Sequence, residues 1–371
     1  MPAIEIAVDR AVLPHVVAVG AQVTVQDGRV VAVATGTAKA GARRLAGTLL
    51  PGFVDLQVNG GGGRSVDEAE PRALDAVARA VWAGGAVAFL PTLITAPWER
   101  LLQQVDAVSR WIERAPADGA EPLGLHVEGP FLEVGGVHDA ACFVDPTPAR
   151  VDALLAAARG RLRLVTLASS RAGAAAAVAR LRAAGVATSL GHVADPRGFD
   201  ECVAAGAGLV THLFNAMGPL HHREPGIAGR CLDEARLCCA LIADGAHVHP
   251  AMLRTAFAVL GSDRTLLSSD ATAAMGMPDG DYALAGRRVF ARGGVVRDAD
   301  GRLAGSALTM AGAARTFVHH VPTAGVWTLG RIAATNPAER IGARDFGSIA
   351  PGCRAAFTLL GDDGSTIAVR C

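Results

Sequence analysis

The chain has 371 residues, of which 51% are hydrophobic, and its 35 basic residues balance its 35 acidic residues. This length suits a single eight-unit α/β barrel with a small accessory domain. The balanced charge gives no indication of binding to nucleic acid or acidic membranes through bulk charge. No segment reaches membrane-spanning length without Gly, Pro or charge, so we expect a cytoplasmic protein with neither partner.

The first 50 residues predict a small β domain that the end of the chain completes. Both regions show short alternating segments, separated by the turn signals Asp27-Gly28 and Gly361–Gly364. The expected strands are Val17–Val19, Gln22–Val25, Arg29–Val33, Ala355–Leu360 and Thr366–Arg370. We therefore predict a β-sandwich built from residues 1–50 and 342–371.

Residues 51–341 alternate short apolar runs with segments of helical period, which is typical of a parallel sheet. The eight predicted strands are Phe53–Val58, Ala86–Leu90, Leu123–Val127, Leu162–Leu167, Val186–Leu190, Gly208–His212, Cys239–Ala243 and Thr265–Ser269. The predicted helices cover 71–83, 98–115, 147–159, 172–184, 196–205 and 250–260. This pattern predicts an α/β fold, a (β/α)8 TIM-type barrel.

Three polar residues stand at the ends of predicted strands, where the chemistry of such a barrel is found. Glu128 follows the third strand, His192 the fifth, and His212 ends the sixth. One carboxylate and two imidazoles form the ligand set of an open catalytic zinc site, with one position left for water. The alternative for each residue alone is to cap a helix or to satisfy loop backbone. His126, level with Glu128, is either a ligand or the partner of one.

Asp270 follows the last predicted strand and is the candidate general base, because a carboxylate there can take a proton from water activated by a metal. The alternative is an N-cap, since Asp270-Ala271-Thr272 is a plausible helix start.

The loop after the sixth strand contains Asn215, Ala216 and Arg223. Arginine suits bidentate recognition of phosphate, so this loop is a candidate phosphate site. A solvated surface loop is the alternative.

One known family is matched, in this order, by Pro51–Gly60, Leu90–Thr95, Gly124–Phe131, Gly191-His192, Thr211–Met217, Arg223–Gly226, Asp244–Val248, Ser269–Thr272, Gly305–Met310, Asn336–Ala338 and Gly347–Gly352. On these stretches the chain resembles the N-acetylglucosamine-6-phosphate deacetylases of the amidohydrolase superfamily. The resemblance implies a metal-dependent barrel that hydrolyses the acetamide of N-acetyl-D-glucosamine 6-phosphate to D-glucosamine 6-phosphate and acetate, in amino-sugar catabolism.

The resemblance also implies roles for individual residues. Metal ligation is implied for Glu128, His192 and His212, acid/base catalysis for Asp270, and substrate binding for His138, Asn215, Ala216, Arg223 and His247. It further implies a homodimer in which Arg223 reaches the substrate phosphate of the neighbouring subunit.

Gln57 and Asn59 occupy the end of the first strand, where many metal-dependent hydrolases carry His-x-His. Neutral amides replace imidazoles poorly as metal ligands, so we expect one divalent metal per chain. Zn²⁺ is the expected ion, with Fe²⁺, Co²⁺ or Mn²⁺ as alternatives. Gln57 and Asn59 are expected to form hydrogen bonds near the water or the substrate.

Two stretches differ from the family pattern. Ala168-Ser169-Ser170 stands where many members have Ala-Pro-Glu, and Val134–Val137 lacks a lysine that is frequent before the histidine at 138. These differences affect the substrate side of the site, so a related substrate such as N-acetylgalactosamine 6-phosphate is an alternative.

Overall fold

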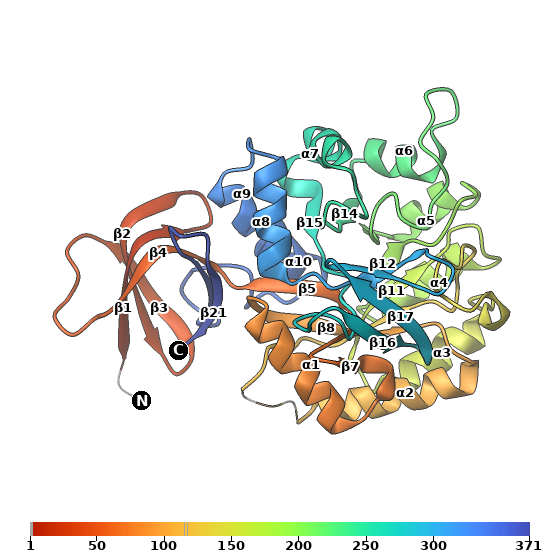
Figure 1. Ribbon diagram of the computed structural model, residues 1–371, viewed down its shortest axis with the longest axis horizontal. Helices are drawn as coiled ribbons and strands as arrows, with labels where there is room; N and C mark the ends of the chain where they lie inside the picture. The colour runs from red at the N-terminus through yellow and green to blue at the C-terminus, as the bar shows by residue number, and fades with distance from the viewer. Residues whose placement is uncertain (1–2, 115, 117) are drawn as a thin grey trace.

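The computed structural model describes residues 3–114, 116 and 118–371 (Figure 1). Eight parallel strands form its central sheet, and each lies where a strand was predicted. They are β5 Phe53–Val58, β8 Ala86–Ile94, β10 Leu125–Glu128, β11 Leu162–Leu167, β12 Ala187–Leu190, β13 Leu209–Val210, β14 Cys238–Leu241 and β15 Thr265–Leu267. Each strand pairs with its neighbour in the chain, and the short β9 (Glu121–Pro122) pairs with β8.

The barrel closes between its first and last strands without a regular ladder. Val58 forms a single parallel bridge with Ala271, and the N–H of Asn59 donates to the carbonyl oxygen of Ala271 at 2.7 Å. One buried carboxylate completes this seam: Asp55 accepts hydrogen bonds from the backbone N–H of Ser269 (3.2 Å) and the hydroxyl of Ser268 (3.3 Å). Burial is the main reason why the pKa of Asp55 is raised to about 6.

Helices cover the outside of the barrel. They are α1 Pro71–Ala83, α2 Trp98–Ile112, α3 Pro148–Ala157, α4 Ala174–Ala183, α5 Phe199–Ala205, α6 Gly226–Asp233, α7 Pro250–Arg264, α8 Met310–His320, α9 Val326–Gly330 and α10 Asn336–Arg340, with a π-helix at Arg331–Thr335. In α2, Leu101, Val105 and Val108 repeat at helical spacing and are fully buried. The helix predicted over 98–115 ends at Ile112, and residue 115 lies outside the described residues.

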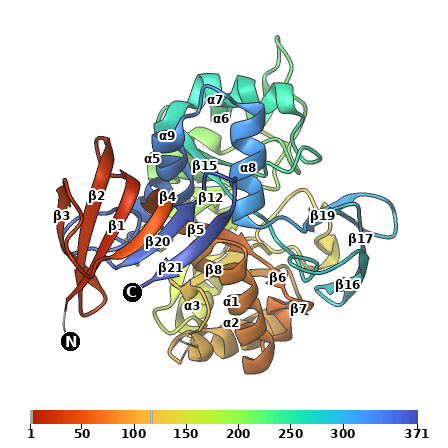
Figure 2. The same cartoon turned by 60° about the vertical axis from the view of Figure 1, so that its left-hand side comes forward.

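The two ends of the chain meet in one six-stranded sheet, to the left of the barrel in Figures 1 and 2. Its order is β21-β20-β4-β1-β2-β3, with β1 Ile4–Val12, β2 Val17–Gln26, β3 Arg29–Thr35, β4 Arg43–Pro51, β20 Ala356–Leu360 and β21 Thr366–Arg370. Arg29, the first residue of β3, forms an antiparallel bridge with Arg354, which lies just before β20. The sheet therefore curls around its own apolar core. The predicted fold class, a (β/α)8 barrel with a small β-sandwich domain built from both termini, is confirmed.

A four-stranded antiparallel sheet between β15 and α8 was not predicted. It consists of β16 Gly280–Leu284, β17 Arg287–Arg292, β18 Val295–Arg297 and β19 Leu303–Ser306. Figure 2 shows it on the side of the barrel away from the terminal sheet. A small hairpin, β6 Gly60–Gly61 with β7 Arg64–Ser65, and two 3-10 turns, Val66–Glu68 and Ala140–Cys142, complete the described elements. No helix in the described ranges is long and apolar enough to cross a membrane.

Candidate functional site

Three side chains converge at the carboxyl ends of the barrel strands. Glu128 is the last residue of β10, His192 lies two residues beyond β12, and His212 lies two residues beyond β13. The distance to Glu128 Oε1 is 3.2 Å from His192 Nε2 and 3.1 Å from His212 Nε2, and the two nitrogens lie 3.1 Å apart. All three residues are at most 4% exposed. The structure thus brings together the three predicted metal ligands.

The hydrogen bonding of His192 defines which of its nitrogens is free. Its Nδ1 lies 2.8 Å from the carbonyl oxygen of Val134, which can only accept, so Nδ1 carries the hydrogen. Burial, followed by the neighbouring His138, lowers the pKa of His192 to about 4, so the ring is neutral. Its Nε2 therefore points a lone pair at the Glu128 carboxylate.

The charge of Glu128 governs the rest of the cluster. Burial would raise its pKa, but the three surrounding imidazoles of His138, His192 and His212 outweigh burial and hold the pKa well below the ordinary value. Burial would also lower the pKa of His212, yet the hydrogen bond and charge of Glu128 raise it. The carboxylate is accordingly ionised.

This donor set fits a divalent cation. A carboxylate oxygen and an imidazole lone pair repel each other at 3.2 Å unless a positive charge lies between them. In a tetrahedral site with ligand bonds of about 2.0–2.1 Å, neighbouring ligand atoms lie about 3.3 Å apart. The observed separations of 3.1 to 3.2 Å come close to that value.

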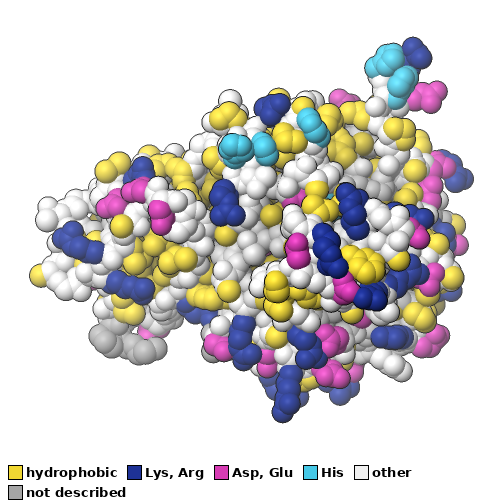
Figure 3. Space-filling model, in the orientation of Figure 1, with side chains coloured by type: hydrophobic (Ala, Val, Ile, Leu, Met, Phe, Trp, Pro, Cys, Tyr) yellow, Lys and Arg dark blue, Asp and Glu magenta, His cyan; other side chains and the backbone are white. Residues whose placement is uncertain are grey.

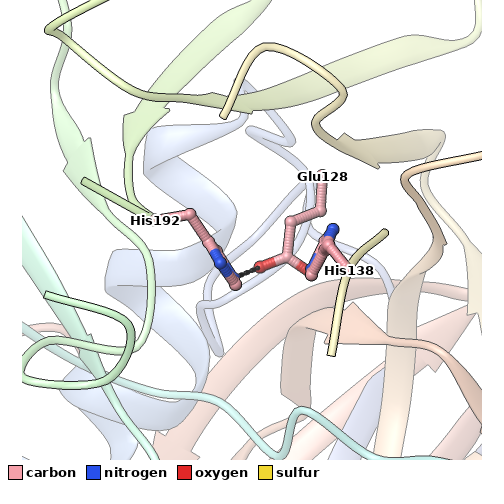
Figure 4. A group of neighbouring side chains, drawn as sticks. All are labelled: Glu128, His138 and His192. Carbon is pink, nitrogen blue, oxygen red and sulfur yellow. Dashed lines mark ion pairs between the residues drawn. The ribbon is translucent and has the colours of Figure 1, made fainter. Parts of the chain in front are cut away.

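His138 approaches the other oxygen of the same carboxylate, and Figure 4 shows Glu128 between His138 and His192. Its Nε2 lies 3.6 Å from Glu128 Oε2, so Glu128, His138 and His192 form a second possible ligand set. The backbone N–H of Thr95, however, donates to His138 Nδ1 at 3.4 Å. Nδ1 also lies 2.9 Å from Thr95 Oγ1, a hydroxyl that can donate to it. With Nδ1 accepting from Thr95, the ring hydrogen is on Nε2, where it can donate but cannot bind a metal.

Asp270 lies in the same pocket and is held by the two amides at the end of β5. Its Oδ1 accepts from Gln57 Nε2 at 3.0 Å and from Asn59 Nδ2 at 2.7 Å. Burial, followed by the negative charge of Glu128, raises the pKa of Asp270 to about 6. Gln57 and Asn59 therefore bind the candidate base itself, a partner that the sequence did not indicate for them.

The pocket has a volume of about 140 Å³. Its lining includes Glu128, His138, His192, His212, Asp270, Asn59, Asn215, Ala216 and His247, and so most of the predicted site residues. His247 is oriented by a neighbour, because its Nδ1 lies 2.6 Å from Asp244 Oδ2. Hydrogen bonds from His247 and the backbone overcome the effect of burial and lower the pKa of Asp244.

Arg223 does not line the pocket. It lies on the exposed loop 219–225, which projects beyond α6 (Figures 1 and 3). Its guanidinium Nη1 lies 3.2 Å from Nε2 of the adjacent His222. Among the residues that the structure describes, Arg223 forms no ion pair. The structure therefore separates Arg223 from the other predicted substrate-binding residues of its own chain.

The sequence pattern of the amidohydrolase family matches residues 48–369. The chain belongs to the amidohydrolase family. An N-acetylgalactosamine-6-phosphate deacetylase of Escherichia coli O157:H7 is 36% identical over 84% of this chain and 83% of its own length. An N-acetylglucosamine-6-phosphate deacetylase of Bacillus subtilis is 33% identical over 87% and 83%. The Mycobacterium smegmatis N-acetyl-D-glucosamine-6-phosphate deacetylase, solved as a mutant with N-acetyl-D-glucosamine-6-phosphate, superposes with a TM-score of 0.93 at 34% identity, covering 99% of this chain and 97% of that one.

The backbone of this amidohydrolase is strained at its site. His192, His212 and Asp270 have φ values of 51°, 30° and 49°, a region that residues other than glycine seldom adopt. Each such residue costs about 1–3 kcal/mol, and such strain persists only where the surrounding structure enforces it. Asp270 therefore lacks the extended backbone of a helix N-cap, the alternative that the sequence offered for it.

Several residues of the site were not predicted. Thr95 sets the tautomer of His138, and Asp244 orients His247. The spacing Asp244-Gly245-Ala246-His247, which lets an aspartate reach a histidine three residues later, was a signal for the second pair. Leu284 and Leu303 line the pocket from the unpredicted sheet, and no motif marked them.

Proposed function

We propose that this chain hydrolyses the acetamide of an N-acetylhexosamine 6-phosphate, with N-acetyl-D-glucosamine 6-phosphate as the leading substrate, giving D-glucosamine 6-phosphate and acetate. One observation carries the proposal: Glu128, His192 and His212, here called the cation-binding triangle, line one pocket together with the carboxylate of Asp270. Curated deacetylases of this substrate class, at 33 to 36% identity over most of the chain, support it.

Glu128, His192 and His212 are the proposed ligands of one divalent metal. When bound, the ion supplies a Lewis acid for the acetyl carbonyl and lowers the pKa of water. Neutral imidazoles with one carboxylate suit Zn²⁺, and the same set accepts Fe²⁺, Co²⁺ or Mn²⁺. The tautomer inferred for His138 supports the choice of His212 over His138 as the third ligand.

Asp270 is the proposed proton shuttle. It removes a proton from the attacking water as the new C–O bond forms at the acetyl carbon. It then returns that proton to the amide nitrogen as the C–N bond breaks, which releases a free amine and acetate. A carboxylate with a pKa raised to about 6 is suited to both steps near neutral pH. Gln57 and Asn59 hold its Oδ1, so Oδ2 remains for the proton.

His138 and His247 are the proposed contacts to the sugar and its acetyl group. The Nε2 hydrogen of His138 points into the pocket beside Glu128, where it can donate to the acetyl oxygen. His247 donates its Nδ1 hydrogen to Asp244, which leaves Nε2 free to accept from a sugar hydroxyl. Asn215 and Ala216 also line the pocket and are proposed as further contacts to the substrate.

N-acetylgalactosamine 6-phosphate is the second candidate substrate, because a relative named for that activity is 36% identical to this chain. Ser169 and Ser170 do not line the pocket, and Ser170 instead donates to Glu133 at 2.6 Å. Gly136 and Val137 do line it, so the loop before His138 is the part of the unusual sequence that meets the substrate.

A homodimer with Arg223 supplied to the neighbouring subunit is part of the proposal. Its support is the exposure of the 219–225 loop and the distance of Arg223 from its own pocket. We also propose a cytoplasmic location, which suits a chain whose seven cysteines are all free.

The deciding experiment is acetate release from both sugar phosphates by the purified, metal-loaded protein. We expect release from at least one of them, abolished in Glu128→Gln and by chelation. Absence of release above the Glu128→Gln control from both substrates overturns the proposal.

A further inference from the structure

A chain of buried polar side chains crosses the barrel directly below the proposed metal ligands. Its members are Thr92 on β8, His126 on β10, Thr166 on β11, Ser189 on β12 and Thr211 beside β13, each at most 3% exposed. Here they are called the hydroxyl-imidazole belt. His126, for which the sequence allowed either a metal ligand or the partner of one, lies in this belt in the barrel interior and outside the cation-binding triangle.

The belt residues are hydrogen-bonded in series. His126 Nδ1 lies 3.3 Å from Thr92 Oγ1, and His126 Nε2 lies 2.8 Å from Thr166 Oγ1. Thr211 Oγ1 then lies 2.7 Å from Thr166 Oγ1 and 2.6 Å from Ser189 Oγ. The series therefore links five consecutive strands of the barrel through side chains alone.

Polar residues are unusual in this position. The layer beneath the belt contains Leu56, Leu164, Leu209 and Leu266, the kind of branched apolar residues that normally fill barrel interiors. Buried hydroxyl and imidazole groups are costly unless all of them are bonded, so a polar layer is a demanding way to fill space. Because this polar layer lies directly under the proposed metal ligands, we looked for a way in which it affects their position.

Each strand that carries a proposed ligand also carries a belt residue. His126 stands two residues before Glu128, Ser189 three residues before His192, and Thr211 immediately before His212. The spacing of these three strands at the belt therefore sets the spacing of the ligands one layer above.

The belt also contacts the backbone beside His192. A Cβ atom built on Gly191 would lie 2.9 Å from both Thr166 Cγ2 and Thr211 Cβ, so only glycine fits there. In addition, the N–H of Gly129, which follows Glu128, donates to the carbonyl oxygen of Thr166 at 3.1 Å. Thr166 and Thr211 thus touch the chain directly next to two ligands.

We propose that the hydroxyl-imidazole belt positions the metal ligands: by fixing the spacing of β10, β12 and β13, it holds Glu128 Oε1, His192 Nε2 and His212 Nε2 at cation-binding separation. The inference rests on the metal role proposed above for these three residues. The belt residues act through the ligands and contact neither the cation nor the substrate.

The test compares variants that lose one hydroxyl of the belt with variants that leave the hydrogen bonds of the belt intact. Thr166→Val and Thr211→Val break the belt, and Thr211→Ser retains its hydroxyl. Thr188→Val is the matched control, because Thr188 is 2% exposed on the same strand as Ser189 and its hydroxyl has no partner in the described structure. For each protein, Co²⁺ affinity is measured by competition with a chelator, and the visible absorption of the Co²⁺ form reports ligand geometry.

We expect Thr166→Val and Thr211→Val to bind Co²⁺ about 10–100-fold more weakly, with an altered absorption spectrum. Thr188→Val and Thr211→Ser should keep the wild-type affinity and spectrum. If Thr211→Val matches Thr188→Val in both, the belt is only structural and the inference is wrong. If the wild-type protein itself binds no Co²⁺, the metal assignment fails and the belt inference fails with it. Thermal unfolding of the metal-free variants identifies any that do not fold. If one of Thr166→Val and Thr211→Val does not fold, the Co²⁺ affinity and spectrum of the other test the inference.

Discussion

The side-chain amide of Asn59 donates to Oδ1 of Asp270 at 2.7 Å, across 211 residues of sequence. A hydrogen bond to the ionised carboxylate lowers its pKa, against the burial that raises it. Asn59, at the end of β5, therefore lowers the pKa of Asp270, the proposed proton shuttle.

Removal of this donor should shift the acidic limb of the pH profile upward. In Asn59→Ala the ionised form of Asp270 loses a hydrogen bond, so its pKa rises and a higher pH is needed to deprotonate the base. We expect a rise of about one pH unit in the acidic midpoint of kcat/KM, equivalent to about 1.4 kcal/mol. Gln104→Ala, which removes a buried amide bonded to the carbonyl oxygen of Asp67, is the control. An unchanged or lowered midpoint contradicts the role of Asn59.

The two possible ligand sets share Glu128 and His192 and differ in whether His212 or His138 is the third ligand. They therefore predict that different variants lose the metal. His212→Asn should lose metal affinity by about tenfold or more, because it removes one vertex of the triangle. His138→Asn should retain the metal and lose turnover, since its Nε2 carries a hydrogen. Elemental analysis after dialysis distinguishes the two outcomes. Loss of metal from His138→Asn, with retention in His212→Asn, assigns the site to Glu128, His138 and His192 instead.

Arg223 can be tested by subunit mixing. Arg223→Ala should raise KM and leave the metal content unchanged, and Asp270→Asn should be inactive. After random exchange of subunits, half of the dimers pair the two variants and each has one complete site, so about a quarter of wild-type activity should return. If mixing restores nothing, Arg223 does not serve the neighbouring subunit.

The buried carboxylate of Asp55 should make stability depend on pH. Its pKa is raised from 3.8 to about 6 on folding, so between these values the folded state binds more protons than the unfolded state. Stability from this group is present at low pH and is lost as pH rises toward 6, by about 3 kcal/mol in total.

Urea unfolding of wild type and Asp55→Asn at several pH values between 4 and 7 measures this effect. The wild-type free energy of unfolding should fall relative to that of the variant as pH rises. Asp300→Asn, at an exposed position, controls for the change in net charge. A constant difference across this range contradicts the raised pKa.

The barrel was predictable because its strands are buried apolar runs that end in polar groups. Phe53–Val58 and Leu162–Leu167 were located to the residue. The β16–β19 sheet was missed although Ala285-Gly286 and Gly293-Gly294, all with positive φ, are hairpin turns. These turns lie within residues 51–341, a range for which the alternating pattern predicted only βα units.

The site was predictable in composition but not in connectivity. The clustering of Glu128, His192 and His212 was predictable because strand ends converge in a barrel. The bonds from Gln57 and Asn59 to Asp270 depend on closure of β5 against β15, and sequence spacing carries no information about that seam. The tautomer of His138 depends on its contacts with the backbone N–H and the hydroxyl of Thr95, which sequence spacing does not reveal.

The shared sheet of the two termini sets an order of events during synthesis. Strand β4 pairs with β20, and the backbone N–H of Phe53 donates to Thr358 across 305 residues. At a translation rate of about 5–20 residues per second, β4 waits about 15 to 60 s for its partner to leave the ribosome. Throughout that interval the edge of β4 that pairs with β20 has unpaired backbone N–H and C=O groups. Such an edge can pair with another chain, so the nascent protein is prone to aggregate until β20 is made.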